Sequence, residues 1–93
     1  AYSIGSPPSE KGYLEFYLAL VPDGVLTPRL AALKPGDRLY IAPKITGTFT
    51  LQEVPPNHNL ILVATGTGLA PYLAMVRHKG CLNPERRVTI VHG

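Results

Sequence analysis

The second half of the chain contains residues with the composition of a phosphate-binding turn. In the segment ILVATGTGLAPYL, residues 61–73, Gly66 and Gly68 flank a single threonine and precede Pro71. Glycine tolerates positive φ and lets a ligand approach the backbone closely, and the first N–H groups of a following helix lack intrahelical partners. We therefore expect an anion-binding turn here, with positive φ accessible at both glycines and a helix starting near Pro71.

Pro71 stands where the dinucleotide-binding fingerprint Gly-x-Gly-x-x-Gly has its third glycine. Proline is tolerated in the first turn of a helix, so this exchange leaves a phosphate site possible. A Walker A loop is excluded, because no Gly-Lys-Ser/Thr follows. A plain strand-turn-helix connection explains the spacing equally well. The next apolar strand ends in His92 and Gly93, without the acidic residue that would bind the ribose of NAD, which favours NADP.

A second candidate anion site lies in DGVLTPRL, residues 23–30. Thr27 is placed to be the N-cap of a short helix with Pro28 at its first position and Gly36 after its apolar residues. The positive end of the helix dipole would attract a phosphate there. Helix capping alone also explains Thr27.

Two kinds of element must position these turns. Residues 13–21 and 38–42 are rich in aromatic and aliphatic residues and lie between turn sequences, which predicts antiparallel strands. Residues 59–65 and 87–93 predict continuously apolar strands on either side of a helix over residues 71–80. The fold class expected is β followed by α/β, with part of an antiparallel barrel over residues 1–55 and the first βαβ unit of a Rossmann-like domain over residues 56–93.

Composition narrows the functional classes. Nine Lys and Arg against six Asp and Glu give a net charge of +3, without a dense basic run, so we expect no nucleic-acid partner. The three histidines lack metal-ligand spacing to one another or to the lone Cys81, and we expect no metal site. Arg77 is expected to complement a helix dipole, and Arg86 to lie in solvent. Without a leader or a long apolar run, a cytoplasmic protein is expected, and the two incomplete halves suggest a piece of a longer chain.

Three stretches in this order, AYS at residues 1–3, LEFYLALVPDGVLTPRLAALKPGD at residues 14–37 and LVATGTGLAPYL at residues 62–73, resemble the bacterial ferredoxin (flavodoxin)–NADP+ reductases. The resemblance covers nearly the whole chain. It implies an FAD-binding antiparallel barrel followed by an NADP-binding α/β domain. In that family the glycine turn reads Gly-Thr-Gly-x-x-Pro, so Pro71 fits the pattern.

The resemblance also implies roles for individual residues. Tyr2 would stack on the flavin ring and Ser3 would donate a hydrogen bond near the flavin N5, which makes these two the catalytic candidates. The flavin would be lined by the chain around Tyr17, Leu18 and Ala19, and its phosphates held by the backbone of Val25, Leu26 and Thr27. In the glycine turn, Thr67 would face flavin and nicotinamide. The NADP site would comprise Thr65, Gly66, Thr67, Gly68, Leu69, Ala70 and Pro71, with the pyrophosphate on the last four.

The function implied is hydride transfer between NADPH and the flavin N5, with ferredoxin or flavodoxin as the electron partner. Two alternatives stay open at the level of sequence. The same barrel and turn serve flavin reductases with oxygenase or siderophore partners. A non-catalytic nucleotide-binding module would use Thr27 and the turn at residues 65–71 only to hold phosphate.

Overall fold

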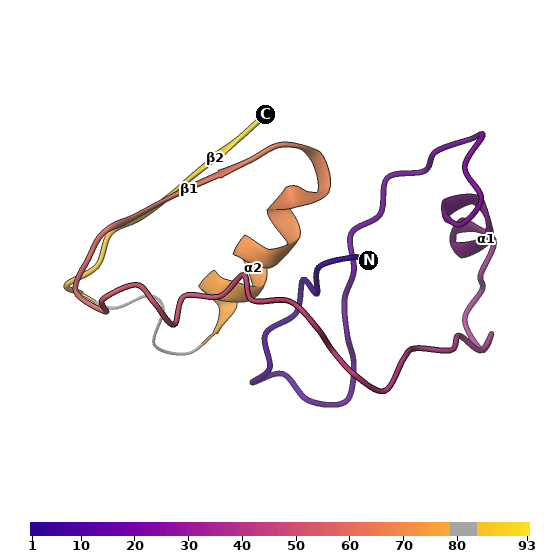
Figure 1. Ribbon diagram of the computed structural model, residues 1–93, viewed down its shortest axis with the longest axis horizontal. Coiled ribbons are helices and arrows are strands. Elements are labelled where there is room, and N and C mark those ends of the chain that lie inside the picture. Colours follow the sequence, from indigo (N-terminus) through magenta and orange to yellow (C-terminus); the bar gives the residue numbers. More distant parts are fainter. Residues whose placement is uncertain (79–83) are drawn as a thin grey trace. The chain divides into compact units, whose positions relative to one another are not determined.

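The computed structural model describes residues 1–78 and 84–93 (Figure 1). Its elements are, in chain order, α1 (Thr27–Ala31), β1 (Leu60–Ala64), a 3₁₀ turn η1 (Gly66–Gly68), α2 (Leu69–Arg77) and β2 (Val88–His92). The predicted end of the second helix near Gly80, and Cys81, lie outside the described residues. Within those residues, α2 ends at Arg77 and His78 is extended.

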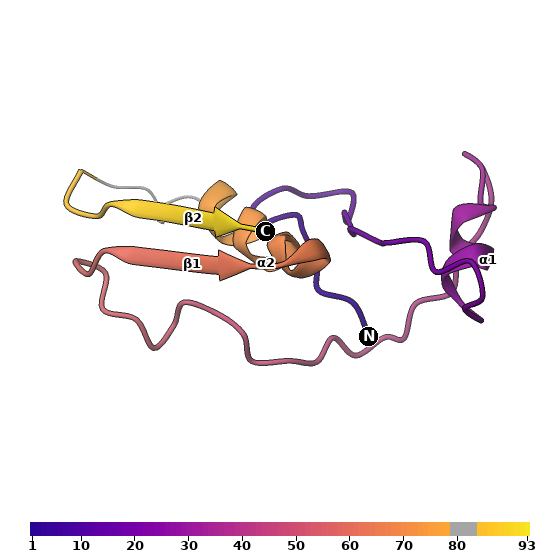
Figure 2. The same ribbon diagram turned by 90° about the horizontal axis from the view of Figure 1, so that it is seen from above.

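The two strands form a parallel pair. Leu60 lies opposite Val88, and the register continues to Ala64 opposite His92. Figure 2 shows β1 and β2 side by side and running in the same direction. A parallel connection needs a crossover, and α2 supplies it. The predicted succession of strand, helix and parallel strand is therefore confirmed, and it is compatible with a βαβ unit.

One face of β1 carries the core. Leu60, Leu62 and Ala64 are buried, while Ile61 and Val63 are exposed. Leu60 and Leu62 pack with five partly buried residues from the preceding loop, α2 and β2, namely Leu51, Val54, Tyr72, Val76 and Val88. The sequence predicted a strand that is apolar on both faces. Among the described residues only one face is covered, because α2 packs on that side alone.

Residues 13–21 and 38–42 are not strands in the described part of the chain. The backbone pairing found in that part of the sequence is an isolated antiparallel bridge between Ile4 and Phe16, next to a hydrogen bond of 2.7 Å from the Gly5 N–H to the Glu15 carbonyl oxygen. A strand forms only when a neighbour satisfies its N–H and C=O groups. Apart from that bridge, no continuous partner strand lies beside these segments among the described residues, so the antiparallel barrel stays a prediction.

The chain divides into two compact units. The first combines Ala1–Tyr17 with Phe49–Gly93, and the second is Leu18–Thr48. The predicted domain boundary between residues 55 and 56 falls in a turn of the first unit, where the His58 N–H donates to the Pro55 carbonyl oxygen at 3.1 Å. No helix within residues 1–78 and 84–93 is long and apolar enough to cross a membrane.

In the second unit, α1 is shorter than the sequence suggested. It begins at Thr27 and ends at Ala31, five residues before Gly36. Gly36 instead takes a φ of +94° in a turn closed by a 2.9 Å hydrogen bond from the Asp37 N–H to the Lys34 carbonyl oxygen. Pro35 and Gly36 occupy the central positions that a type II turn requires, so these residues form a turn of their own rather than a helix end.

Candidate functional site

The glycine turn lies at the carboxyl end of β1, beside the carboxyl end of β2. Gly66 has a φ of +52°, a conformation that favours glycine, and a Cβ added there would meet nothing within 4 Å. Thr65, Gly66, Thr67 and Gly68 are all exposed. The turn is therefore open to a ligand at the edge where parallel α/β sheets bind nucleotides.

Gly68 does not use positive φ, contrary to the expectation from the sequence. Its φ is −60° and its ψ is −10°, both close to helical values, because the 3₁₀ turn runs directly into α2. An added Cβ would lie 3.9 Å from the Ala64 Cβ, an ordinary contact. Glycine at this position is therefore not required by the protein backbone.

Several polar groups of the turn are already paired within the protein. The Gly66 N–H donates to the Gly93 carbonyl oxygen at 3.3 Å, and the Gly68 N–H donates to the Thr65 carbonyl oxygen at 3.0 Å. The His92 Nε2 lies 3.0 Å from the Gly66 carbonyl oxygen. These contacts hold the turn against the end of β2. A phosphate would draw on the remaining N–H groups of the first helical turn.

The helix after the turn begins two residues earlier than expected. Leu69 is its first residue, so Pro71 is the third, still within the turn where proline costs no hydrogen bond. Ala70 is buried, and a Cβ added to Gly5 would lie 3.8 Å from the Ala70 Cβ. Ala70 therefore packs against the N-terminal segment and can offer only its backbone to a ligand.

Thr27 is not an N-cap, and this prediction was wrong. Leu26 occupies the N-cap position, and no side chain caps the helix. The Thr27 hydroxyl instead accepts a hydrogen bond of 2.9 Å from the Val21 N–H and lies 3.4 Å from the Val21 carbonyl oxygen. The reason is the tight turn at Gly24, which brings Val21 back over the first residue of the helix. The hydroxyl is thus used to close this loop.

The other predicted flavin residues fall in both units. Tyr2, Ser3 and Tyr17 belong to the first unit, together with the glycine turn, and all three are exposed. The second unit contains the remaining ones, Leu18, Ala19, Val25, Leu26 and Thr27, of which only Thr27 is buried. The structure therefore brings together in one unit the two catalytic candidates and the nucleotide turn.

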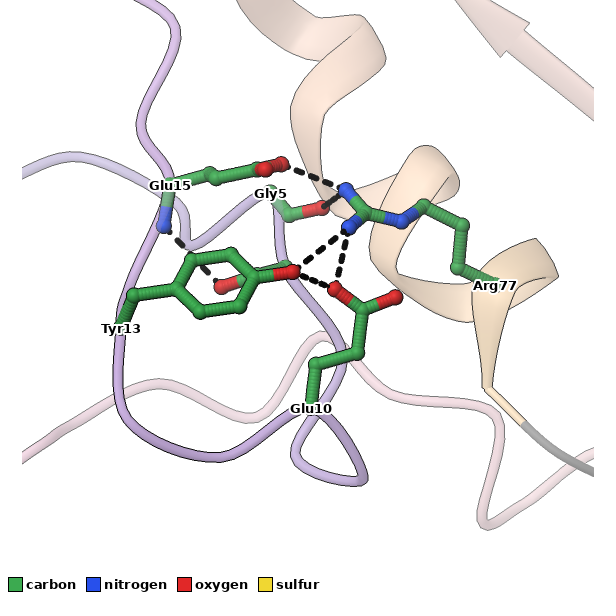
Figure 3. A network of polar contacts seen from close by, with 6 residues as sticks. Gly5, Glu10, Tyr13, Glu15 and Arg77 are labelled. Carbon is green, nitrogen blue, oxygen red and sulfur yellow. Dashed lines mark hydrogen bonds and ion pairs between the residues drawn. The ribbon is translucent and has the colours of Figure 1, made fainter.

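Two arginines have structural roles that the sequence did not predict. Arg86, expected in solvent, is buried; its Nε donates to the His58 carbonyl oxygen at 2.9 Å and its Nη2 to the Pro55 carbonyl oxygen at 2.6 Å. Arg77 pairs with Glu10 and Glu15 (Figure 3). The hydrogen bond that Arg77 donates to Glu15 is the main cause that raises the pKa of the Arg77 guanidinium. These partners are 28 to 67 residues away in sequence, so no local pattern could have identified them.

Within residues 1–78 and 84–93, no group of three or more His, Cys, Asp and Glu side chains is placed to hold a metal ion. The candidate site consists of a glycine turn and a helix N-terminus, and the same unit carries the exposed side chains of Tyr2, Ser3 and Tyr17. An open glycine turn between a parallel strand and a helix is typical of nucleotide-binding α/β domains.

Comparison with known proteins makes this class more specific. The chain is 45% identical over 92 residues to a flavodoxin/ferredoxin–NADP reductase of Escherichia coli (strain K12), covering 99% of this chain and 37% of that protein. It is 44% identical over 93 residues to a ferredoxin–NADP reductase of Pseudomonas aeruginosa and 40% identical over 93 residues to one of Azotobacter vinelandii, in each case covering 100% of this chain and 36% of that protein. No protein-family model matches the chain.

The family resemblance is thus confirmed: over its whole length, the chain is similar to one part of the flavodoxin/ferredoxin–NADP reductases. It spans a little over a third of the length of the curated relatives that it matches.

Proposed function

We propose that this chain is part of a ferredoxin (flavodoxin)–NADP reductase, a cytoplasmic flavoprotein that passes electrons between NADPH and ferredoxin or flavodoxin. The observation that carries this proposal is the similarity along the whole chain, 45% over 92 residues, to relatives that bear this name. Residues 1–55 would contribute to an FAD-binding antiparallel barrel, and residues 56–93 would begin the NADP-binding domain.

The glycine turn would hold the NADP pyrophosphate. Its open position at the carboxyl ends of β1 and β2, with α2 behind it, supports this role. Because the N–H groups of Gly66 and Gly68 are engaged within the protein, the contribution of Gly68 would be space for the pyrophosphate rather than a donor. The backbone from Leu69 to Pro71 would complete the site, and Thr65 would lead into it.

The flavin would be bound by residues within the range 1–55. Tyr2 is 40% exposed and offers a ring face for stacking. Tyr17, Leu18 and Ala19 would line the flavin, and the backbone of Val25, Leu26 and Thr27 would receive its phosphates. Since the Thr27 hydroxyl is bonded to Val21, Thr27 would act there through its backbone and by shaping the loop.

FAD, when bound, accepts a hydride from NADPH and releases single electrons. The chain would bind and orient the two nucleotides and donate a hydrogen bond at the flavin N5 from Ser3. Within the described residues the Ser3 hydroxyl has no hydrogen-bond partner, so it is available for this bond. No side chain of the site needs to act as an acid or a base.

The test uses the full-length protein and its Ser3→Ala variant. We expect a yellow wild-type protein whose flavin is reduced by NADPH. In Ser3→Ala we expect FAD to stay bound while flavin reduction slows about 2- to 10-fold, because one neutral hydrogen bond contributes about 0.5–1.5 kcal/mol. Single-turnover mixing with NADPH measures this step directly.

Ser9→Ala is the matched control, because Ser9 lies exposed in the same segment. This variant should reduce at the wild-type rate. A colourless wild-type protein that binds NADPH would favour a non-catalytic nucleotide-binding module. A yellow protein that is reduced by NADPH but passes no electrons to ferredoxin or flavodoxin would favour a reductase with an oxygenase or siderophore partner.

A further inference from the structure

A polar cluster links the N-terminal segment to the last turn of α2 (Figure 3). Its members are Glu10, Tyr13, Glu15 and Arg77. The Arg77 Nη1 lies 2.5 Å from a Glu15 carboxylate oxygen, and the Nη2 lies 2.5 Å from a Glu10 carboxylate oxygen. The Nη1 also donates to the Gly5 carbonyl oxygen at 3.4 Å, and the Tyr13 hydroxyl bonds to Glu10. One guanidinium therefore bridges two carboxylates and a backbone carbonyl.

The elements joined by this cluster are those that carry the proposed site. Glu15 is tied to the N-terminal residues by two more bonds, from the Gly5 N–H to its carbonyl oxygen at 2.7 Å and from its own N–H to the Ser6 hydroxyl at 3.0 Å. Gly5 also packs near Ala70. The segment that carries Tyr2 and Ser3 is thus held against the helix that follows the glycine turn.

Added stability of the fold is a weak explanation for this polar cluster. The side chains of Arg77, Glu10 and Glu15 are 31%, 35% and 40% exposed. Ion pairs of this exposure add little to stability, because water screens the charges. The Arg77 guanidinium, however, fixes geometry as well as charge, because its planar group holds a different carboxylate at each terminal nitrogen. Positional accuracy is therefore the stronger consequence of this arrangement.

We propose that Arg77 is a positioning residue that sets the place of the Tyr2–Ser3 segment relative to the glycine turn, and thereby the alignment of flavin and nicotinamide. This inference rests on the proposed function. The reacting atoms of a hydride transfer must lie within about 3–3.5 Å of each other, and a displacement of about 1 Å can slow a reaction about 100-fold. A link between the Tyr2–Ser3 segment and the glycine turn therefore affects the rate of hydride transfer more than the affinity for FAD or NADPH.

The first experiment measures flavin reduction in the full-length protein carrying Arg77→Met. We expect the single-turnover rate with NADPH to fall about 5- to 50-fold while the FAD content and the dissociation constant for NADP+ change less than about twofold. Arg77→Lys keeps the charge but replaces the planar fork of donors with a single ammonium nitrogen, so it should restore only part of the rate. Arg87→Met is the matched control, because it removes an exposed arginine from the same unit, and it should retain the wild-type rate.

The second experiment measures the link between Arg77 and the N-terminal segment without any catalytic step. Amide hydrogen exchange at Gly5 and Glu15 should be faster in Arg77→Met than in the wild type, and unchanged in Arg87→Met. Glu15→Gln should weaken the same protection. Adding it to Arg77→Met should change the exchange less than the sum of the single effects, because both substitutions break one interaction.

The outcomes separate this proposal from the proposed function. A wild-type protein without flavin, or with flavin that NADPH does not reduce, would overturn the proposed function and this inference together. A wild-type protein that works, with an Arg77→Met variant reduced at the same rate, would overturn this inference alone. Equal losses of rate, FAD content and NADP+ affinity in Arg77→Met would show that Arg77 serves general stability, which would overturn its positioning role. Unchanged amide exchange at Gly5 would show that Arg77 does not hold the N-terminal segment.

Discussion

At the scale of single residues, polar side chains of this chain act mainly on distant backbone groups. The Thr27 hydroxyl accepts from the Val21 N–H, Arg86 donates to two carbonyl oxygens before β1, and the His92 ring contacts the Gly66 carbonyl oxygen. Each contact ties a loop to another segment of the chain. The loops around the proposed phosphate sites are therefore shaped by side-chain contacts as well as by backbone hydrogen bonds.

Thr27→Ala tests this view at the first loop. Removing the hydroxyl leaves the Val21 N–H without its acceptor, so the free energy of unfolding of the full-length apoprotein should fall by about 0.5–1.5 kcal/mol. FAD affinity should fall with it, because the loop that would hold the flavin phosphates loses its shape. Urea unfolding and FAD titration measure the two effects.

Thr27→Ser keeps the hydroxyl and is the control for that substitution, so it should retain both stability and FAD affinity. A loss of FAD affinity in Thr27→Ala without any loss of stability would mean that the hydroxyl contacts the ligand directly. In that case the bond to Val21 would not be its main role.

At the scale of elements, the glycine turn combines two glycines with different requirements. Gly66 has a φ of +52°, while Gly68 has the dihedral angles of a helical residue. The backbone therefore explains the first glycine and not the second. The proposed NADP pyrophosphate, which must approach the backbone closely, would explain the second, and the two substitutions to alanine should separate these causes.

Gly66→Ala should destabilise the full-length protein by about 1 kcal/mol, because an alanine resists the left-handed conformation. Gly68→Ala should leave the stability within about 0.5 kcal/mol of the wild type, since its new Cβ makes only an ordinary contact with Ala64. NADPH affinity, in contrast, should fall about tenfold in Gly68→Ala, because one extra methyl group against a bound pyrophosphate costs about 1–3 kcal/mol.

Chemical denaturation and NADPH titration distinguish the two variants, with FAD content as the control that should change in neither. Normal NADPH binding by Gly68→Ala would remove the pyrophosphate from this part of the turn. A large loss of stability in the same variant would show instead that the glycine serves packing.

At the scale of the whole molecule, apolar surface remains exposed in both units. Ile61 and Val63 are 74% and 63% exposed on the face of β1 that α2 does not cover, and Tyr40 is 96% exposed in the second unit. A two-stranded sheet with one covered face is marginal by itself.

The 93-residue polypeptide alone should therefore unfold without a sharp transition and retain FAD weakly. We expect a broad melting curve by circular dichroism and binding of a hydrophobic dye below the melting range, whereas the full-length protein should melt cooperatively. A sharp two-state transition of the isolated polypeptide with tight FAD retention would contradict this expectation.

The sequence by itself determined the elements between residues 60 and 92, but not the strands expected at residues 13–21 and 38–42, which are absent among the described residues. Continuous apolar runs predicted β1 and β2 and their parallel pairing, the glycine spacing predicted the turn between β1 and α2, and the ordered motifs predicted the family resemblance. These signals survive without knowledge of the fold because dihedral preference and local hydrogen bonding depend on adjacent residues.

Only the tertiary structure decided which side chains hold these elements together. Arg77 meets carboxylates 62 and 67 residues away, Arg86 meets carbonyl oxygens 28 and 31 residues away, and Thr27 bonds to a residue of the preceding turn instead of capping its helix. Nothing local distinguishes such an arginine from a solvated one. The path of the chain brings the partners of each arginine close to it. That path depends on burial of Leu60 and Leu62 against α2, a contact between residues far apart in sequence.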